Sequence, residues 1–254
     1  MPSFGLITEG VTDQQVIRAI LDGFFDPEDV DVRPFLPIAD KTYRHQTSSF
    51  SNWQLVLEYC ASPKLQEALP FVDYLIIHID TDRCDDPVFG VPKVENGKAL
   101  PAHDIVTRVI ANLRERIGGP TWEMCHERIL FAVSVETIEC WLLPLFATGN
   151  QKSKHLNCLD VLNRCLRKKN RHPINPQSKE PRYYSELSRS YARRHSLFQH
   201  CAENPSLNIF VEQLRATFVT ATWDGADQIA VSDVLQKPTT IEKRLVDDLQ
   251  QTDE

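Results

Sequence analysis

Several features that would assign a chain to a membrane or secreted class are missing from this 254-residue sequence. It contains no apolar run close to the ~18 residues that a membrane-spanning helix needs. Its first residues, MPSFGLITEG, lack the basic segment and the apolar stretch of a secretory signal. We therefore expect a cytoplasmic protein that has no contact with a membrane.

The motifs of common zinc, redox and nucleotide sites are also missing. The seven cysteines form no CxxC pair, and their odd number leaves one over in any pairing scheme. The eight histidines show neither HxxxH nor HxH spacing, which argues against a zinc site. No GxxxxGK(S/T) segment occurs, so we do not expect this chain to bind ATP through a P-loop. We expect reduced, buried thiols in a reducing compartment, and we expect any ATPase to be a partner.

The chain does contain enough apolar residues for a sizeable core, and its charge is unevenly distributed. Hydrophobic residues make up 42% and charged residues 25%, so a core can form without disulfides or a structural metal. The net charge is −7, but residues 152–194 hold twelve Lys or Arg against three acids, which leaves the remainder at −16. A polyanion-binding face beside an acidic body explains this split. The alternative is a solvated helix surface rich in arginine.

Alternating strand and helix patterns occupy the first part of the chain. Apolar runs predict strands, and recurrences of three and four residues predict the helices between them. The strands are expected at 4–8, 30–36, 74–79 and 129–135, and the helices after Thr12, at 53–60 and at 104–117. Thr12 is a credible N-cap, with Gln15 completing a capping box. This order predicts an α/β fold with a mostly parallel sheet flanked by helices.

Strands become scarce beyond Trp141, and the pattern turns helical. Helices are expected at 156–166, 183–191, 207–218 and 241–249, while 42–52 and 85–102 are expected to be loops. The sequence thus predicts an α/β metal-binding catalytic domain over residues 1–145. A mainly helical, basic C-terminal region is expected over 146–254.

Three of the predicted strands end in acidic residues. Glu9 follows the first, Asp80 and Asp82 follow the third, and Glu136 follows the last. Ligands of open parallel sheets bind at the shared carboxyl edge, so these carboxylates should lie together. Such a cluster stays ionised only around a cation, because like charges at close range repel. Oxygen-only ligands select hard ions, so the sequence predicts a Mg²⁺ or Mn²⁺ site suited to phosphoryl transfer on nucleic acids.

Two neighbouring acids extend this set. Asp13 lies one helical turn beyond Glu9 and could share its ion, and Glu139 could hold a second ion together with Glu136. Simpler interpretations exist, because acidic turns after strands are often only solvated. Glu139 could also be a first-turn charge that favours a helix N-terminus.

Two segments carry a resemblance to a known superfamily. Glu9-Gly10-x-Thr12-Asp13 and Asp80-x-Asp82 resemble the TOPRIM domain of topoisomerases, primases and the OLD nucleases over residues 4–140. The segments 135–143 (VETIECWLL) and 204–210 (NPSLNIF) are similar to a branch of small bacterial proteins. Members of that branch are often encoded beside ABC/SMC-type ATPases in phage-defence loci.

The resemblance implies roles for the acids. Glu9 would act as general acid/base or metal ligand, and Asp80 and Asp82 would bind Mg²⁺. Asp13 joins the metal site in the OLD-like pattern, and the branch motif places Glu136 and Glu139 there too. The chain has no tyrosine-nucleophile domain and no zinc-binding cysteine set. Strand passage and primer synthesis are therefore not expected.

The function expected from residues and resemblance together is that of a Mg²⁺-dependent nuclease acting on DNA or RNA, tRNA included. It would be a toxic effector of anti-phage defence, controlled by an ABC/SMC-type ATPase, with a second copy of the chain as a further candidate partner. The basic segment would grip the phosphate backbone. The expected phosphate contacts are Lys179, Arg182, Arg193 and Arg194. Tyr183 and Tyr184 would either stack on a base or pack in the core.

Two other functions account for part of these residues. A haloacid-dehalogenase-type phosphatase needs a nucleophilic Asp, a second Asp two residues on, and a Thr or Val two beyond that. Cys84 occupies the last position, and Glu9 would have no role. A non-catalytic or inhibited subunit bound to an ATPase is the other alternative, with the acidic body as its docking face.

Overall fold

The computed structural model describes residues 1–37 and 52–218. Two expectations fall wholly or mostly outside these ranges: the polar loop at 42–52, of which only the final residue is described, and the helix at 241–249. Within the described ranges, no helix is long and apolar enough to cross a membrane.

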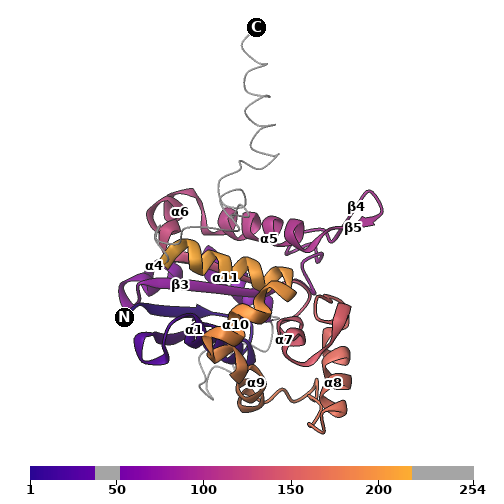
Figure 1. Ribbon diagram of the computed structural model, residues 1–254. Helices are drawn as coiled ribbons and strands as arrows, with labels where there is room; N and C mark the ends of the chain where they lie inside the picture. The colour runs from indigo at the N-terminus through magenta and orange to yellow at the C-terminus, as the bar shows by residue number, and fades with distance from the viewer. Residues whose placement is uncertain (38–51, 219–254) are drawn as a thin grey trace, which may run out of the picture.

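A four-stranded parallel sheet forms the centre of the fold (Figure 1). Its strands are β1 (Ser3–Ile7), β2 (Asp31–Leu36), β3 (Tyr74–Asp80) and β6 (Ile129–Ser134). They lie in the order β2-β1-β3-β6, and every neighbouring pair is parallel. The predicted α/β class with a mostly parallel sheet is confirmed. The order also puts the carboxyl ends of β1, β3 and β6 side by side.

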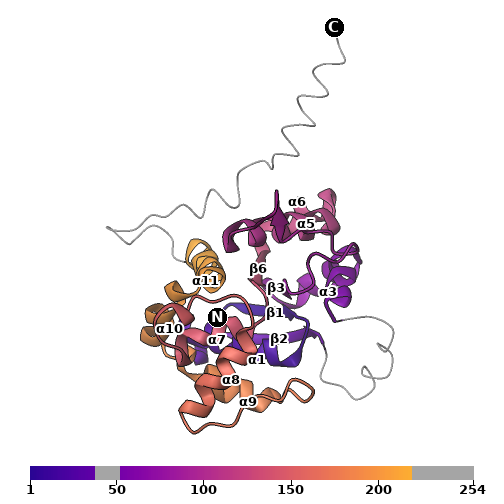
Figure 2. The same cartoon turned by 90° about the vertical axis from the view of Figure 1, so that its right-hand side faces the viewer.

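Helices cover both faces of the sheet (Figure 2). On one face, Leu75, Ile77 and Ile79 pack against α3 (Asn52–Ala61) and α5 (Ala102–Ile117). On the other face, Ile76 packs with α1 (Val11–Phe24) and the C-terminal helices. Because side chains alternate along a strand, His78 and Asp80 share the face of Ile76.

The C-terminal helices complete the second face. They are α7 (Glu139–Phe146), α8 (Cys158–Lys168), α9 (Pro181–Ser188), α10 (Arg194–His200) and α11 (Pro205–Phe218). Helices at 156–166, 183–191 and 207–218 were predicted, whereas α7 and α10 were not. Trp141, Tyr184 and Leu207 are all fully buried in one core with residues of α1, so side chains from both sides of residue 145 pack together.

Helix α11 lies along the free edge of β6. The Gln213 side chain accepts a hydrogen bond from the Phe131 N–H (3.1 Å) and donates one to the Phe131 carbonyl (2.9 Å). It thereby satisfies the backbone groups that a neighbouring strand would otherwise pair. The start of α11 lies near the carboxyl end of β6, where the Val135 N–H donates to Ser206 Oγ at 3.3 Å.

The long connection after β3 contains a structure that was predicted as loop. Short strands β4 (Val94–Glu95) and β5 (Lys98–Ala99) pair antiparallel around Asn96 and Gly97, whose φ angles are 52° and 73°. Asn-Gly is the preferred pair for a two-residue hairpin turn, because both positions need positive φ. The hairpin signal was therefore present in the sequence. Two further short helices, α4 (Lys64–Ala68) and α6 (Gly119–Cys125), flank the sheet.

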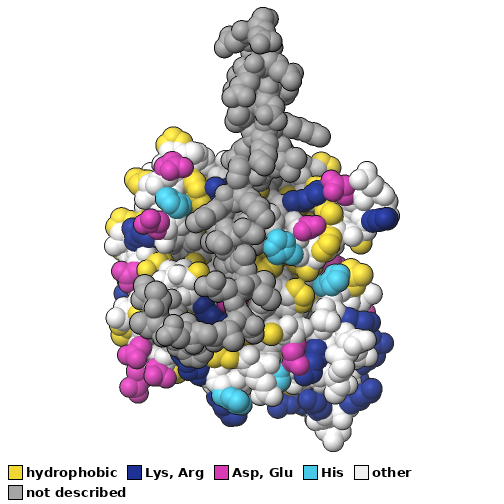
Figure 3. Space-filling view, turned by 45° about the horizontal axis from the view of Figure 1, so that its top comes forward, with side chains coloured by type: hydrophobic (Ala, Val, Ile, Leu, Met, Phe, Trp, Pro, Cys, Tyr) yellow, Lys and Arg dark blue, Asp and Glu magenta, His cyan; other side chains and the backbone are white. Residues whose placement is uncertain are grey.

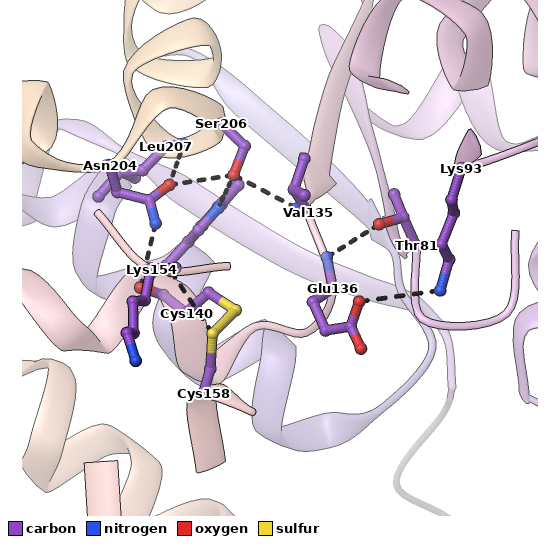
Figure 4. Close-up of a disulfide and its surroundings, with 11 residues drawn as sticks. Thr81, Lys93, Val135, Glu136, Cys140, Lys154, Cys158, Asn204, Ser206 and Leu207 are labelled. Carbon is purple, nitrogen blue, oxygen red and sulfur yellow. Dashed lines mark hydrogen bonds and ion pairs between the residues drawn. A yellow bond between two sulfur atoms is a disulfide. The ribbon is translucent and has the colours of Figure 1, made fainter. Parts of the chain in front are cut away.

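The expectation of seven reduced thiols is wrong for one pair. Cys140 at the start of α7 and Cys158 at the start of α8 form a disulfide (Figure 4). The other five cysteines, at positions 60, 84, 125, 165 and 201, are free and buried as expected. Sequence spacing gave no sign of the pair, because it depends on how α7 and α8 pack.

Candidate metal centre

The first two strand-end acids meet across the sheet edge. Glu9 follows β1, and Asp80 is the last residue of β3. The Asp80 N–H donates a hydrogen bond of 2.7 Å to Glu9 Oε1. This contact joins the ends of the two strands and brings the two carboxylates together, as their positions in the sequence predicted.

Asp13 joins them from the first turn of α1. Its Oδ2 accepts the Gly10 N–H at 2.7 Å, and its Oδ1 accepts the Thr12 hydroxyl at 3.2 Å. The helix begins at Val11 with Gly10 as N-cap, so the predicted Thr12 cap with Gln15 is wrong. Asp13 supplies the reciprocal hydrogen bond because it stands at the third helical position, where a carboxylate also favours the helix dipole.

Glu139 approaches the same place from the start of α7, with only 1% of its side chain exposed. Its Oε1 accepts hydrogen bonds from Lys179 Nζ, at 2.7 Å, and from the Tyr184 hydroxyl. Its Oε2 is buried and has no hydrogen-bond partner. One oxygen is thus fixed by the protein, and the other is free to bind a ligand.

Asp82 lies at the exposed rim of this group, close enough for its charge to act on Glu9 and Asp80, whereas Glu136 faces Lys93. Asp82 is exposed in the turn after β3, and its N–H donates to the Glu136 carbonyl at 3.0 Å. The Glu136 side chain faces Lys93 Nζ at 3.7 Å (Figure 4). Lys93 also donates to the Asp82 carbonyl at 2.5 Å. The expected pairing of Glu136 with Glu139 is not formed, because each is held by a different lysine.

Burial and mutual repulsion shift the pKa values of the central acids upward. Burial, followed by the charge of Asp13, raises the pKa of Glu9 to about 8. Burial and the charge of Glu139 raise the pKa of Asp13 to about 7. Burial and the surrounding charges of Glu9, Asp13, Glu139 and Asp82 raise the pKa of Asp80 well above its ordinary value.

Glu139 behaves in the opposite way. Burial alone would raise its pKa, but the Lys179 ammonium and the hydrogen bonds from Lys179 and Tyr184 hold it below the ordinary value. Burial likewise opposes the charge on Lys179, yet Glu139 raises the pKa of that lysine. The two form an ionised pair beside three carboxyl groups that resist ionisation.

Three residues of this site were not assigned to it from the sequence. His78 is fully buried between Asp13 and Asp80, with Nδ1 3.6 Å from Asp13 Oδ2 and Nε2 3.5 Å from Asp80 Oδ1. Its position two residues before Asp80, on the same face of β3, was a usable signal. Lys179 and Tyr184 come from the basic C-terminal region, and only the fold reveals that they reach Glu139.

The four cations expected to contact phosphate have different surroundings. Lys179 lies beside the group of Glu9, Asp13, Asp80 and Glu139, which we call the acidic centre. Arg194 donates to the Phe24 carbonyl at 2.6 Å and so holds α10 against α1. Arg193 is exposed, and Arg182 is almost fully exposed, 3.6 Å from Glu186. Tyr184 is buried and therefore packs rather than stacking on a base.

The donor set suits a hard cation, although it is not a closed cage. Among the described residues, no group of three or more His, Cys, Asp or Glu has an arrangement ready to hold a metal ion. However, Asp80 Oδ1 and Glu139 Oε2 are buried without hydrogen-bond partners. Mg²⁺ keeps several waters and needs only one or two protein carboxylates, so an open site of oxygen donors fits it.

Comparisons with known proteins give no family for this chain. No protein-family model matches the sequence, and no match is found among curated proteins or solved structures. The resemblance to the TOPRIM superfamily therefore stays a prediction from the segments around Glu9 and Asp80.

Proposed function

We propose that this protein is a nuclease that depends on Mg²⁺ or Mn²⁺ and cleaves DNA or RNA. The observation that supports it best is the group formed by the buried Asp13 and the half-buried Glu9 and Asp80 at the carboxyl edge of a parallel sheet. Like-charged groups are rarely buried together unless a ligand of opposite charge compensates them. The resemblance to TOPRIM nucleases adds the reaction type.

The residues that would hold the ion are Glu9, Asp13, Asp80 and Asp82, together with the free oxygen of Glu139. The chemistry supplied there by Mg²⁺ or Mn²⁺ would be neutralisation of charge on a phosphodiester and activation of water. In the metal-free protein, burial raises the pKa of Glu9 to about 8, so binding of the ion would displace a proton from this carboxyl group. Its Oε1 accepts the Asp80 N–H, which leaves Oε2 to carry the proton.

Lys179 gives the centre a fixed positive charge. It pairs with Glu139, yet 34% of its side chain remains exposed. The ammonium has three donor hydrogens, so it can contact Glu139 and a phosphate oxygen together. We therefore keep Lys179 as a proposed phosphate contact, beside Glu139 rather than on the general basic surface.

A basic surface beside the centre suits the phosphate backbone. Figure 3 shows Lys and Arg side chains gathered at the lower right of the molecule, where Figure 1 places α8. Arg164, Arg167 and Lys168 are exposed on α8, and none forms an ion pair within the described part of the chain. We name these three residues the α8 cation group. Unpaired exposed cations are available to neutralise phosphates.

The cellular role follows from the resemblance alone. By that analogy the protein would be a cytoplasmic toxic effector of anti-phage defence, restrained or activated by an ABC/SMC-type ATPase partner. Co-purification with a tagged ABC/SMC-type ATPase would test the partnership.

Cleavage assays test the activity directly. Purified protein is incubated with plasmid DNA, single-stranded DNA or tRNA in Mg²⁺, Mn²⁺ or EDTA. We expect cleavage of at least one substrate with metal and none in EDTA, with activity lost in Glu9→Gln and Asp80→Asn. Glu115→Gln, at an exposed position of α5, is the matched control and should remain active. Cleavage that persists in EDTA, or full activity in Glu9→Gln, would contradict the proposal.

A further inference from the structure

His78 occupies a position that the rest of β3 gives to aliphatic residues. The side chain is 0% exposed, and its neighbours Ile76, Ile77 and Ile79 are apolar. Burial lowers its pKa to about 3, against the opposing charge of Glu139, so the imidazole is neutral. A buried polar ring with an unsatisfied nitrogen costs stability. An isoleucine or leucine at this position would stabilise the core more, so packing does not explain why the residue is a histidine.

The contacts of the ring supply one. Nε2 lies 3.0 Å from the Ser134 hydroxyl and 3.5 Å from Asp80 Oδ1. Nδ1 faces Asp13 Oδ2 at 3.6 Å and has no hydrogen-bond partner. The imidazole therefore stands between the two most buried aspartates of the centre, one on each side. We propose that His78 is a positioning residue that sets the spacing of the Asp13 and Asp80 carboxylates for a divalent cation. The inference rests on the metal centre proposed above.

The tautomer of the ring decides what it presents to Asp13. A neutral imidazole has one N–H and one acceptor nitrogen. If the Ser134 hydroxyl donates to Nε2, the proton lies on Nδ1 and points at Asp13. Asp13 is then hydrogen-bonded on the helix side to Gly10 and Thr12, and on the sheet side it faces the His78 N–H across 3.6 Å. The reverse tautomer would direct a lone pair at the carboxylate.

The ring is supported from behind by Trp141. The two rings meet edge to face, with centroids 6.1 Å apart at an interplanar angle of 80°. The Trp141 N–H donates to Ser206 Oγ at 2.8 Å, and Trp141 also stacks on Phe210 at 5.7 Å. Asn204 in turn accepts the Ser206 hydroxyl at 3.0 Å (Figure 4). Residues of the segment 204–210 thus pack against Trp141, which in turn contacts His78.

The test compares His78→Leu with His78→Asn. Leucine has a similar size and no polar atom, whereas asparagine keeps an N–H near the position of Nδ1. Thermal unfolding is measured in EDTA and across a Mn²⁺ titration, and calorimetry gives the Mn²⁺ Kd. His200→Leu is the matched control, since His200 contacts Glu203 at 2.9 Å, outside the acidic centre.

In EDTA we expect His78→Leu to unfold at the wild-type temperature or above it, because an unsatisfied buried nitrogen is removed. Its Mn²⁺ Kd should rise about 10–100-fold, the usual effect of losing a group that orients metal ligands. His78→Asn should bind Mn²⁺ within a few-fold of wild type, and His200→Leu should bind it equally well.

Three results would overturn the inference. A wild-type Kd in His78→Leu would leave the metal centre standing and refute the positioning role. Parallel loss of Mn²⁺ binding and of stability in EDTA, in both His78 variants, would mean that the ring only fills the core. Absence of Mn²⁺ binding by the wild type would refute the metal centre and the positioning role together.

Discussion

Replacing Glu9 by Gln should stabilise the metal-free protein while destroying the proposed site. Glutamine keeps the shape of the side chain and an oxygen that can accept the Asp80 N–H. It lacks the carboxyl proton that the folded protein must otherwise hold. With a folded pKa of about 8 against an ordinary 4.5, Glu9 binds a proton in the folded state that the unfolded chain releases. The stability that this group contributes is complete below pH 4.5 and is lost as pH rises towards about 8.

The magnitude follows from the same two values. Between 4.5 and pH 7, each pH unit costs about 1.4 kcal/mol of unfolding free energy, or roughly 3 kcal/mol in all. Glu9→Gln avoids this cost, so at pH 7 its free energy of unfolding should exceed that of wild type by about 3 kcal/mol. For a chain of this size that corresponds to a rise of about 6–10 °C in Tm. At pH 5 the difference should fall below about 1 kcal/mol.

Urea denaturation in EDTA at pH 5, 6, 7 and 8 measures this difference, with Glu115→Gln as the control for removing an exposed carboxylate. The gap between Glu9→Gln and wild type should widen as pH rises, and the control should show no such trend. If Glu9→Gln is no more stable than wild type at pH 7, or if the gap narrows with rising pH, Glu9 is not buried among like charges.

Three further predictions concern the metal centre and its surroundings. Mn²⁺ should raise the Tm by mass action, and Asp80→Asn/Asp82→Asn should remove most of that rise; an equal rise in the double variant would locate the ion elsewhere. The ion must replace protons on Glu9 and Asp13, whose pKa values are about 8 and about 7. The Mn²⁺ affinity measured by calorimetry should therefore increase from pH 6 to pH 8, and an affinity that does not change with pH would contradict this. Replacing the α8 cation group by Gln should weaken nucleic-acid binding and reduce the slope of log binding constant against log salt concentration by about 2–3, with Arg18→Gln as the control. An unchanged slope would make this surface a docking face for an acidic protein.

The main elements of the fold could be predicted because their signals are local. Apolar runs predicted the strands β1, β3 and β6, and the alternation of strands with helices predicted that the sheet is mostly parallel. The hairpin at Asn96-Gly97 was equally local, and it was missed because the prolines around it suggested an irregular loop. Helix α7 was missed for another reason: it is apolar on all sides, with Trp141 and Leu142 fully buried, and so has no periodic polar face.

The site was predictable only where topology brings consecutive strand ends together. That rule indicated Glu9 and Asp80, and helical spacing from Glu9 added Asp13. It grouped Glu136 with Glu139, yet a backbone turn at Glu136, with φ of 71°, directs its side chain to Lys93 instead. Lys179 and Tyr184 approach from positions about a hundred residues after Asp80, through packing that no local pattern encodes. The pairing of Cys140 with Cys158 was hidden for the same reason.

The basic segment of the sequence does not lie entirely on the surface, because one of its lysines contacts the acidic centre. Lys179 belongs to the basic segment by composition, but its ammonium neutralises Glu139 inside the acidic body. The centre therefore contains one carboxylate kept ionised by a fixed cation and three carboxyl groups whose pKa values are raised. Without a divalent ion those three groups are favoured in their protonated forms, so cation binding must release protons. An ion arriving with a phosphate would find Lys179 already beside it, and the exposed cations of α8 would lie on the surface that the rest of the polyanion has to cross.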